Sequence, residues 1–378
     1  MIDKEFLVIP KPSESPVVPE AGRVPLRGRE RGGSWWMLAR TWLAGIAVLV
    51  GVAVPLAMAT PATAQAQTGT FAYVASGGLD GEGTVSVVNT ATGAVTAKIP
   101  VGMDPQSVAV SPDGSRVYVA NMESDSVSVI DPATNTVTDT IRLPSDKHPA
   151  LSQGVAVSPD GSHVYVTNSG TNSVSVIDPA TNTITDTIQL SKDDNKDMGP
   201  DGVAVGQNVY VVNQDSDNVS VIDPATNKVT ATVSVGDNPH GVAVSPQNVY
   251  VTNTGDGNDN GSVSVIDPAT NTVTGTIQVG EGPWGVAADP VDGANAYVAN
   301  SGSQSVTAIN PGSGNTTTTV QVGNSPVSVA VSPDGSAVYV GNYTDGTLSV
   351  IDPATNAVTA TFPVGPTPSA VAIWEVSN

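Results

Sequence analysis

The fold is decided by a segment that recurs along the chain. Its clearest copy, residues 106–141, reads QSVAVSPDGSRVYVANMESDSVSVIDPATNTVTDTI. Four short runs of β-forming residues alternate with turn signals in this copy, at 107–110, 116–120, 126–130 and 136–141. Ser111-Pro-Asp-Gly114 suits a type I turn, with Pro at the second position and Gly at the fourth. The segment therefore predicts four antiparallel strands joined by short turns.

A Tyr-Val-x-Asn or Tyr-Val-x-Ser motif marks every copy of the segment. It begins at seven of the eight tyrosines, namely Tyr73, Tyr118, Tyr165, Tyr210, Tyr250, Tyr297 and Tyr339. Spacings of 40–47 residues are the period of a β-propeller blade, and no helical periodicity follows residue 67. We therefore expect each copy to form one four-stranded blade.

The two ends of the repeated region complement each other. The first copy begins at a strand over 71–76 and lacks an innermost strand, whereas residues 368–374 supply such a strand without a blade of their own. Six complete copies and one composite copy predict an all-β, seven-bladed β-propeller, closed by its N- and C-terminal strands. Closure of this kind removes exposed strand edges.

The repeated motifs carry a family resemblance. Tyr-Val-Thr-Asn at 165–168 and 250–253, with the recurring Val-Ser-Val-Ile-Asp-Pro-Ala-Thr, resembles the YVTN-repeat seven-bladed β-propeller family over about residues 70–378. The resemblance implies an exported, surface-layer-like repeat protein. Related seven-bladed propellers include lactonases and cofactor-bearing oxidoreductases, so the resemblance specifies no chemistry.

The segments before the repeats predict export. Residues 1–36 form a polar N-terminal extension, which translation from Met37 would omit. Residues 37–66 combine a basic flank, an apolar run and a small-residue site ending at Ala66, which is typical of a signal peptide. A retained signal anchor is the alternative, because the apolar run is near the lower limit of about 17–25 residues for a membrane span. Either way, the domain at 67–378 is expected to be secreted or at the cell surface.

The composition excludes several classes of function. The chain has 35 acidic and 14 basic residues, a net charge of -21, and it contains no cysteine. This charge disfavours nucleic acid, whose binding depends on Lys and Arg at phosphates. The absence of cysteine excludes disulfides, cysteine zinc sites, iron–sulfur clusters and covalently attached c-type haem.

One position varies between copies although its surroundings repeat. It lies just before the small residue of each innermost strand and is occupied by Gln106, Gln153, Asp201, His240, Trp284, Val327 and Ser369. We expect these residues to ring the channel at one level. The first five predict a ligand-binding mouth, and the alternative is that they are unconstrained loop residues that cap the channel.

Two loops suggest further sites. Asp256, Asn258 and Asn260 match the first half of an EF-hand calcium loop, although Asp267 at its twelfth position lies about 16 Å away along an extended strand. This segment is a candidate partial calcium turn, or a polar loop without metal, and no other cofactor is expected. The long links 144–153 and 191–201 could form a charged lip for a partner, or be solvated loops.

No catalytic motif is present: the chain has no nucleophile elbow, zinc-protease helix or phosphate-binding loop. The sequence therefore favours a non-enzymatic, monomeric scaffold or binding module for a protein or glycan, which would contact a membrane only through an uncleaved N-terminal segment. The alternative is a propeller hydrolase resembling the lactonases. It would use His240 and Asp201 as an acid/base pair at the channel mouth, beside Trp284.

Overall fold

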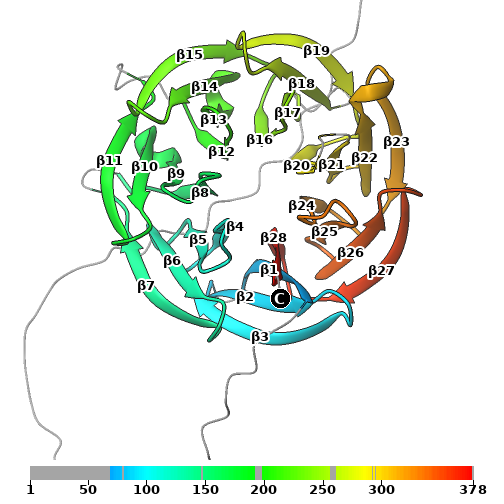
Figure 1. The fold of residues 1–378 in the computed structure, drawn as a ribbon, viewed down its shortest axis with the longest axis horizontal. Coiled ribbons are helices and arrows are strands. Elements are labelled where there is room, and N and C mark those ends of the chain that lie inside the picture. Colours follow the sequence, from blue (N-terminus) through cyan, green and yellow to red (C-terminus); the bar gives the residue numbers. More distant parts are fainter. Residues whose placement is uncertain are drawn as a thin grey trace, which may run out of the picture. The chain divides into compact units, whose positions relative to one another are not determined.

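The computed structural model describes residues 69–78, 81–145, 148–191, 198–255, 261–291, 293 and 295–376. These residues form seven four-stranded antiparallel sheets, which stand as blades around a central channel (Figure 1). The predicted all-β, seven-bladed propeller is confirmed. Among the described residues no helix is long and apolar enough to span a membrane, and the expected signal segment at 37–66 lies outside them.

Each blade runs from an innermost strand at the channel to an outermost strand at the rim. The innermost strands are β28 (Pro368–Val376), β4 (Pro105–Val110), β8 (Ser152–Val157), β12 (Pro200–Val205), β16 (Pro239–Val244), β20 (Pro283–Ala288) and β24 (Pro326–Val331). The second strands are β1 (Gly69–Gly77), β5 (Val117–Asn121), β9 (Val164–Asn168), β13 (Val209–Asn213), β17 (Val249–Asn253), β21 (Ala296–Asn300) and β25 (Val338–Asn342).

The outer half of each blade follows the same order. The third strands are β2 (Gly83–Asn89), β6 (Ser126–Asp131), β10 (Ser173–Asp178), β14 (Asn218–Asp223), β18 (Ser262–Asp267), β22 (Ser305–Asn310) and β26 (Thr347–Asp352). The outermost are β3 (Ala94–Val101), β7 (Thr136–Arg142), β11 (Thr183–Gln189), β15 (Lys228–Ser234), β19 (Thr272–Gln278), β23 (Thr316–Gln321) and β27 (Ala357–Pro363). Three short 3-10 turns complete the described elements: η1 (Ser169–Thr171), η2 (Gln214–Ser216) and η3 (Pro311–Ser313).

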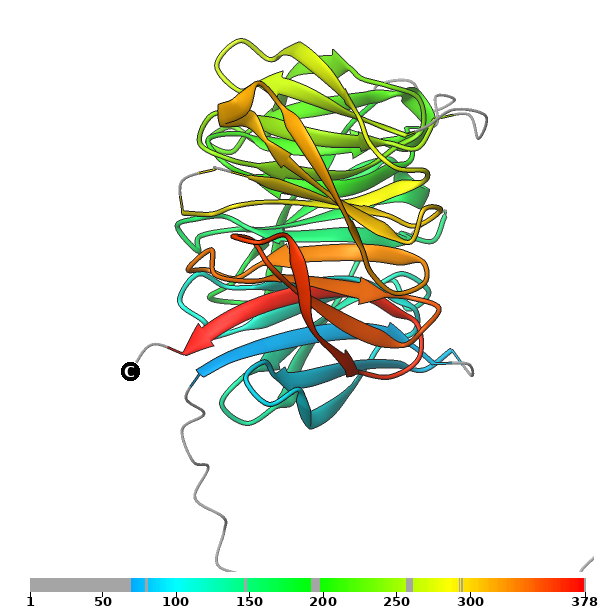
Figure 2. The same ribbon diagram turned by 90° about the vertical axis from the view of Figure 1, so that its right-hand side faces the viewer.

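One blade is built from both ends of the chain. The C-terminal β28 pairs antiparallel with the N-terminal β1, with Tyr73 opposite Ala372, in the sheet β28-β1-β2-β3. Figure 2 shows the two strands side by side, in red and blue. The predicted closure of the ring is therefore confirmed, and it explains why the first copy of the repeat lacks an innermost strand.

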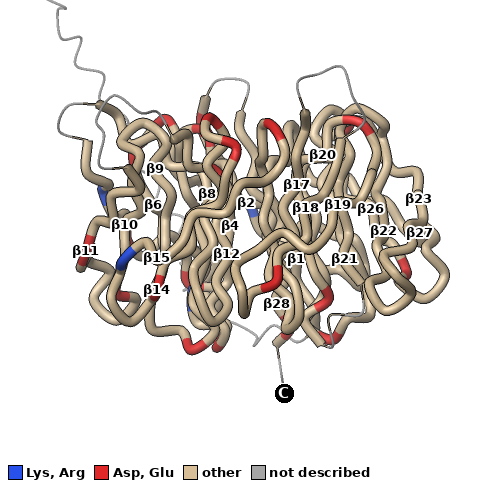
Figure 3. Tube along the Cα trace, turned by 90° about the horizontal axis from the view of Figure 1, so that it is seen from above, with Lys and Arg blue, Asp and Glu red and all other residues tan. Residues whose placement is uncertain are grey.

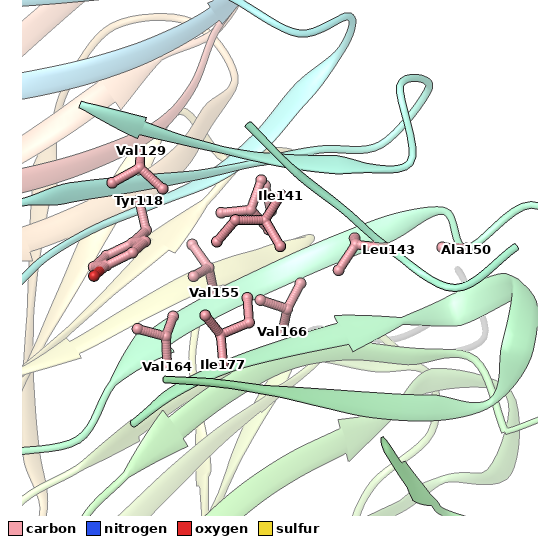
Figure 4. Close-up of a cluster of buried hydrophobic side chains, with 11 residues drawn as sticks. Tyr118, Val129, Ile141, Leu143, Ala150, Val155, Val164, Val166 and Ile177 are labelled. Carbon is pink, nitrogen blue, oxygen red and sulfur yellow. The ribbon is translucent and has the colours of Figure 1, made fainter. Parts of the chain in front are cut away.

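The hydrophobic core lies between neighbouring blades. In one cluster, Tyr118 and Ile141 of one blade pack with Val155, Val166 and Ile177 of the next (Figure 4). The six motif tyrosines from Tyr73 to Tyr297 are at most 1% exposed. Strands buried on both faces read as continuous apolar runs, which explains Val-Tyr-Val in the second strands.

In six of the seven blades the motif asparagine ties neighbouring strands together at one end, whereas the first copy has Ser76 at this position. Asn168 is fully buried, and its Nδ2 donates to Ser175 Oγ at 2.9 Å on the neighbouring strand. Asn253 makes the same bond to Ser264, and its Oδ1 accepts from the backbone N–H of Gly236 in the link between blades. A Cβ on Gly236 would lie 2.8 Å from Asn253 Cγ, so this close approach requires glycine.

Much of the negative charge belongs to turns. Figure 3 shows the acidic residues mostly in loops at the ends of the strands. In the turn after β8, hydrogen bonds from the Ser158 hydroxyl and then from the Ser162 N–H and hydroxyl lower the pKa of Asp160 to about 2. In the turn after β6, Asp131 Oδ1 accepts from the Ala133 N–H at 2.8 Å. These carboxylates stabilise turns, so they do not by themselves indicate a cationic partner.

Candidate functional site

The candidate site is one mouth of the channel, where the described residues leave a cavity of about 490 Å³. Each blade contributes the second residue of its innermost strand to the wall of this cavity: Gln106, Gln153, Asp201, His240, Trp284, Val327 and Ser369. The structure therefore brings together all five residues that the sequence singled out as a mouth.

A β-bulge in each innermost strand explains why this position faces the channel. Pro105 pairs with Asn121 and Ser107 pairs with Ala120, so Gln106 between them has no partner on β5. The register shifts at the same place in the other six blades. An unpaired bulge residue bends the strand and redirects its own side chain. The position is thus free of the ladder and can vary without disturbing the blade.

His240 is the best-connected side chain of the mouth. Its Nδ1 lies 2.8 Å from Asp201 Oδ2, and its Nε2 lies 3.4 Å from Gln214 Nε2. The second hydrogen of that amide goes to Asn238 Oδ1 at 2.9 Å. This pattern assigns the ring proton to Nδ1, which donates to the carboxylate, and leaves Nε2 to accept from Gln214. The imidazole is 5% exposed and is held on both nitrogens.

Trp284 covers His240 on the side of the cavity. The two rings stack with centroids 4.0 Å apart and planes inclined by 20°. The indole is 44% exposed, so one face rests on the imidazole while much of the ring remains accessible in the mouth. An exposed indole fixed on a buried partner is a preformed stacking surface.

Two threonines from the preceding blades fix the main chain of the site. Thr252 Oγ1 donates to the carbonyl oxygen of Trp284 at 2.7 Å and accepts from the Gly241 N–H at 2.8 Å. Thr167 makes the corresponding bonds to Asp201 at 2.6 Å and from Gly154 at 2.7 Å. These are the threonines of the two Tyr-Val-Thr-Asn copies. The other copies have Ala, Val or Gly at this position. Threonine therefore occurs only in the two blades that come immediately before the blades of Asp201 and Trp284, the mouth residues on either side of His240.

The sequence did not single out three further residues of the mouth. Met122, Gln214 and Tyr343 line the cavity, and each directly follows the asparagine of a Tyr-Val-x-Asn motif. Tyr343 is 42% exposed and is the one tyrosine outside the motif. The sequence signal for these residues is that the position after the motif asparagine also varies between copies, although the motif before it is nearly constant.

The mouth carries little charge. Among the described residues that line it, Asp201 is the sole carboxylate and none is Lys or Arg. The described lining of the mouth therefore offers no cationic side chain to an anionic ligand.

The other predicted sites fall largely outside the described residues. This is true of the calcium turn at Asp256, Asn258 and Asn260, and of Lys147, Lys192 and Lys196 in the proposed lip. Within the described part of the chain, no three His, Cys, Asp or Glu residues gather in a way that could hold a metal ion.

Two family models match this chain. Residues 37–151 match the YNCE-like β-propeller model. Residues 164–377, more than half of the chain, match the model of a domain of unknown function, DUF5074. The chain belongs to the DUF5074 family. The YNCE-like match agrees with the β-propeller fold, and neither description names an activity.

Solved structures show the same fold at low identity. Hydrazine synthase from Kuenenia stuttgartiensis is 20% identical, with a TM-score of 0.63 over 72% of this chain and 96% of that one. A functionally unknown protein from Desulfotomaculum acetoxidans is 15% identical, with a TM-score of 0.66 over 82% and 100%. A catalytically inactive histidine-to-alanine variant of virginiamycin B lyase from Staphylococcus aureus, with quinupristin, is 16% identical, with a TM-score of 0.57 over 69% and 84%. Such likenesses concern the fold alone.

One curated relative shares a short segment. The PE-PGRS family protein PE_PGRS18 of Mycobacterium tuberculosis is 60% identical over 38 residues. These residues are 10% of this chain and 8% of that protein, which is about the length of one repeat.

Proposed function

We propose that this DUF5074 protein is a non-enzymatic binding module that holds its ligand in the channel mouth. The observation that carries the proposal is the exposed indole of Trp284, fixed on the buried imidazole of His240. Large apolar surface left accessible in a polar cavity is typical of ligand sites. The hydrogen bonds from His240 to Asp201, from Gln214 to His240 and from Thr252 to the Trp284 carbonyl hold the platform in place before a ligand arrives. This preorganisation reduces the entropy cost of binding.

The same network favours binding over catalysis. A general base needs a nitrogen that can reach the proton it removes. His240 Nε2 already accepts from Gln214, and the ring is 5% exposed. His240 is therefore assigned the role of a positioning residue for Trp284.

The proposal includes an extracytoplasmic location, secreted or at the cell surface. It is supported by the basic flank, apolar run and Ala64-Gln-Ala66 site of residues 37–66. The resemblance to YVTN-repeat and surface-layer-like proteins points the same way. The closed ring has no strand edge at the junction of its ends, which supports a monomeric module for a protein or glycan ligand.

A capture experiment tests the binding role. The full chain, Trp284→Ala and Val291→Ala are immobilised, exposed to an extract of culture medium, and their retained molecules are identified by mass spectrometry. Val291 is a matched control because it is 61% exposed and does not line the mouth. Molecules retained by the full chain and Val291→Ala, but lost from Trp284→Ala, support the proposal. The same molecules on all three proteins would refute it.

A propeller hydrolase is the second candidate, favoured by the 2.8 Å contact between His240 and Asp201. The virginiamycin B lyase structure, inactivated by a histidine-to-alanine change, shows that an enzyme of this fold can depend on a histidine, although its reaction is that of a lyase. Lactone and ester hydrolysis by the full chain and by His240→Ala, with and without calcium, distinguishes the candidates. Turnover that disappears in His240→Ala while the fold is retained would replace the binding proposal.

A further inference from the structure

The mouth has an aromatic side. Trp284 on β20 and Tyr343 after β25 belong to neighbouring blades, line the same cavity, and are 44% and 42% exposed. Both are among the few large apolar side chains exposed in the described chain. Aromatic rings combine a flat apolar face with low conformational entropy, and they stack well against the C–H faces of rigid rings.

The mouth also has an amide side. Gln106 on β4 and Gln153 on β8 come from two other neighbouring blades and are half-buried. Gln153 Nε2 makes its one hydrogen bond at 3.3 Å to Met122 Sδ, which is a weak acceptor. Each side-chain amide offers donors and an acceptor, which matches hydroxyl groups because a hydroxyl also both donates and accepts.

The charge of the mouth separates the remaining ligand classes. Anionic ligands find no Lys or Arg among the described lining residues. An ammonium ion would find one carboxylate, Asp201, whose Oδ2 already accepts from His240. It would also leave the amide N–H groups without acceptors, a costly outcome in a partly buried site. Uncharged ligands rich in hydroxyls satisfy both sides of the cavity.

We propose that the mouth binds a neutral saccharide, with one sugar ring stacked on the open face of Trp284 and hydroxyls bonded to the amides of Gln106 and Gln153. This inference rests on the proposed binding function. The cavity of about 490 Å³ is within the range of roughly 300–1,000 Å³ usual for small-ligand sites. Asp201 accepts from a sugar hydroxyl through the carboxylate oxygen that His240 does not use.

Calorimetric titration of the full chain tests the inference. The probes are cellotriose, maltotriose, triacetylchitotriose and mannotriose as neutral saccharides, trigalacturonic acid as an anionic one, and choline as a cation. We expect at least one neutral trisaccharide to bind, and the anionic trisaccharide and choline not to bind. Trp284→Ala should weaken binding at least about tenfold, the factor that 1.4 kcal/mol represents.

Trp374→Phe is the matched aromatic control. Trp374 lies on β28 beside Gly114, in the turn between β4 and β5, and does not line the mouth. The Trp374→Phe variant should bind the same trisaccharide with the affinity of the unmodified chain. Gln153→Leu should weaken binding while keeping the melting temperature, because it removes only the amide contacts.

The outcomes distinguish this inference from the binding function on which it rests. Binding of choline or trigalacturonic acid in preference to every neutral probe would overturn the saccharide and leave the mouth as a binding site. Capture of a non-saccharide molecule that depends on Trp284 would do the same. Equal saccharide affinity in Trp284→Ala would overturn the placement of the sugar. A mouth that retains no molecule in the capture experiment would overturn both.

Discussion

Deletion of residues 368–378 removes β28 and reopens the ring. This strand faces β1 across eight residue pairs, from Gly69 to Ser76. An antiparallel ladder makes about one hydrogen bond per pair, and each is worth about 0.5–1.5 kcal/mol net. The ladder alone therefore contributes about 4–12 kcal/mol, which is comparable with the whole stability of about 5–15 kcal/mol usual for a domain.

Packing adds to this loss. Val371 is 9% exposed, and Ala370, Ala372 and Trp374 pack against a buried cluster that their own blade forms with the next one. We therefore expect the truncated chain to melt at least about 10 °C lower or to lose its cooperative transition, given roughly 2–4 °C per kcal/mol for large domains. Circular dichroism on heating measures this. Deletion of residues 377–378 alone is the control, and a 368–378 deletion that melts within about 2 °C of it would refute the closure argument.

Three smaller changes test other parts of the structure. The pKa of Asp160 is lowered to about 2 by hydrogen bonds, so its contribution to stability is present above about pH 4 and is lost as the pH falls towards 2. Asp160→Asn should lower the melting temperature at pH 7. The decrease in melting temperature between pH 7 and about pH 2.5 should be smaller in this variant than in the unmodified chain, and an equal decrease would contradict this. Asn300→Ala removes two buried bonds to hydroxyls of the next strand and should cost about 1–3 kcal/mol in urea unfolding, whereas exposed Gln321→Ala should cost under about 0.5 kcal/mol. Thr252→Val removes the hydroxyl that holds the Trp284 carbonyl and should speed hydrogen exchange at the start of β16 and β20; protection equal to that of the unmodified chain would show that this bond does not hold the site.

The sequence was sufficient for the fold because the same local rules are repeated seven times. Alternation predicts strands, Ser-Pro-Asp-Gly and Asp-Pro-Ala-Thr-Asn predict turns, and the missing inner strand before Tyr73 predicts the composite blade. The expected strand at 107–110 begins two residues earlier, at Pro105. The difference arises because Pro105 still pairs with Asn121, so the strand continues beyond Gln106 although Gln106 itself is an unpaired bulge residue.

The site was predictable only in part. Comparison of the copies identified the ring position, since six residue types in seven copies stand out there against a constant background. It could not identify which neighbours touch, because His240 and Asp201 are 39 residues apart and meet only when adjacent blades pack. Gln214 and Tyr343 were missed because each follows a motif that appeared to serve the scaffold alone.

The repeated scaffold limits where chemistry can arise. Most residues of a copy form ladder hydrogen bonds, turns or the core, so a substitution at these positions lowers the stability of the fold. Three positions escape this constraint: the bulge residue, the residue after the motif asparagine, and the third residue of the motif itself. In the sector formed by β12, β16 and β20, side chains at these three positions are joined by hydrogen bonds. Thr167 bonds to the main chain of Asp201, Gln214 to the ring of His240, and Thr252 to the main chain of Trp284. The next two blades carry Val327 and Ser369 at the bulge position, so we expect the sugar ring to stack within this sector, at Trp284, while its hydroxyls reach across the mouth to Gln106 and Gln153.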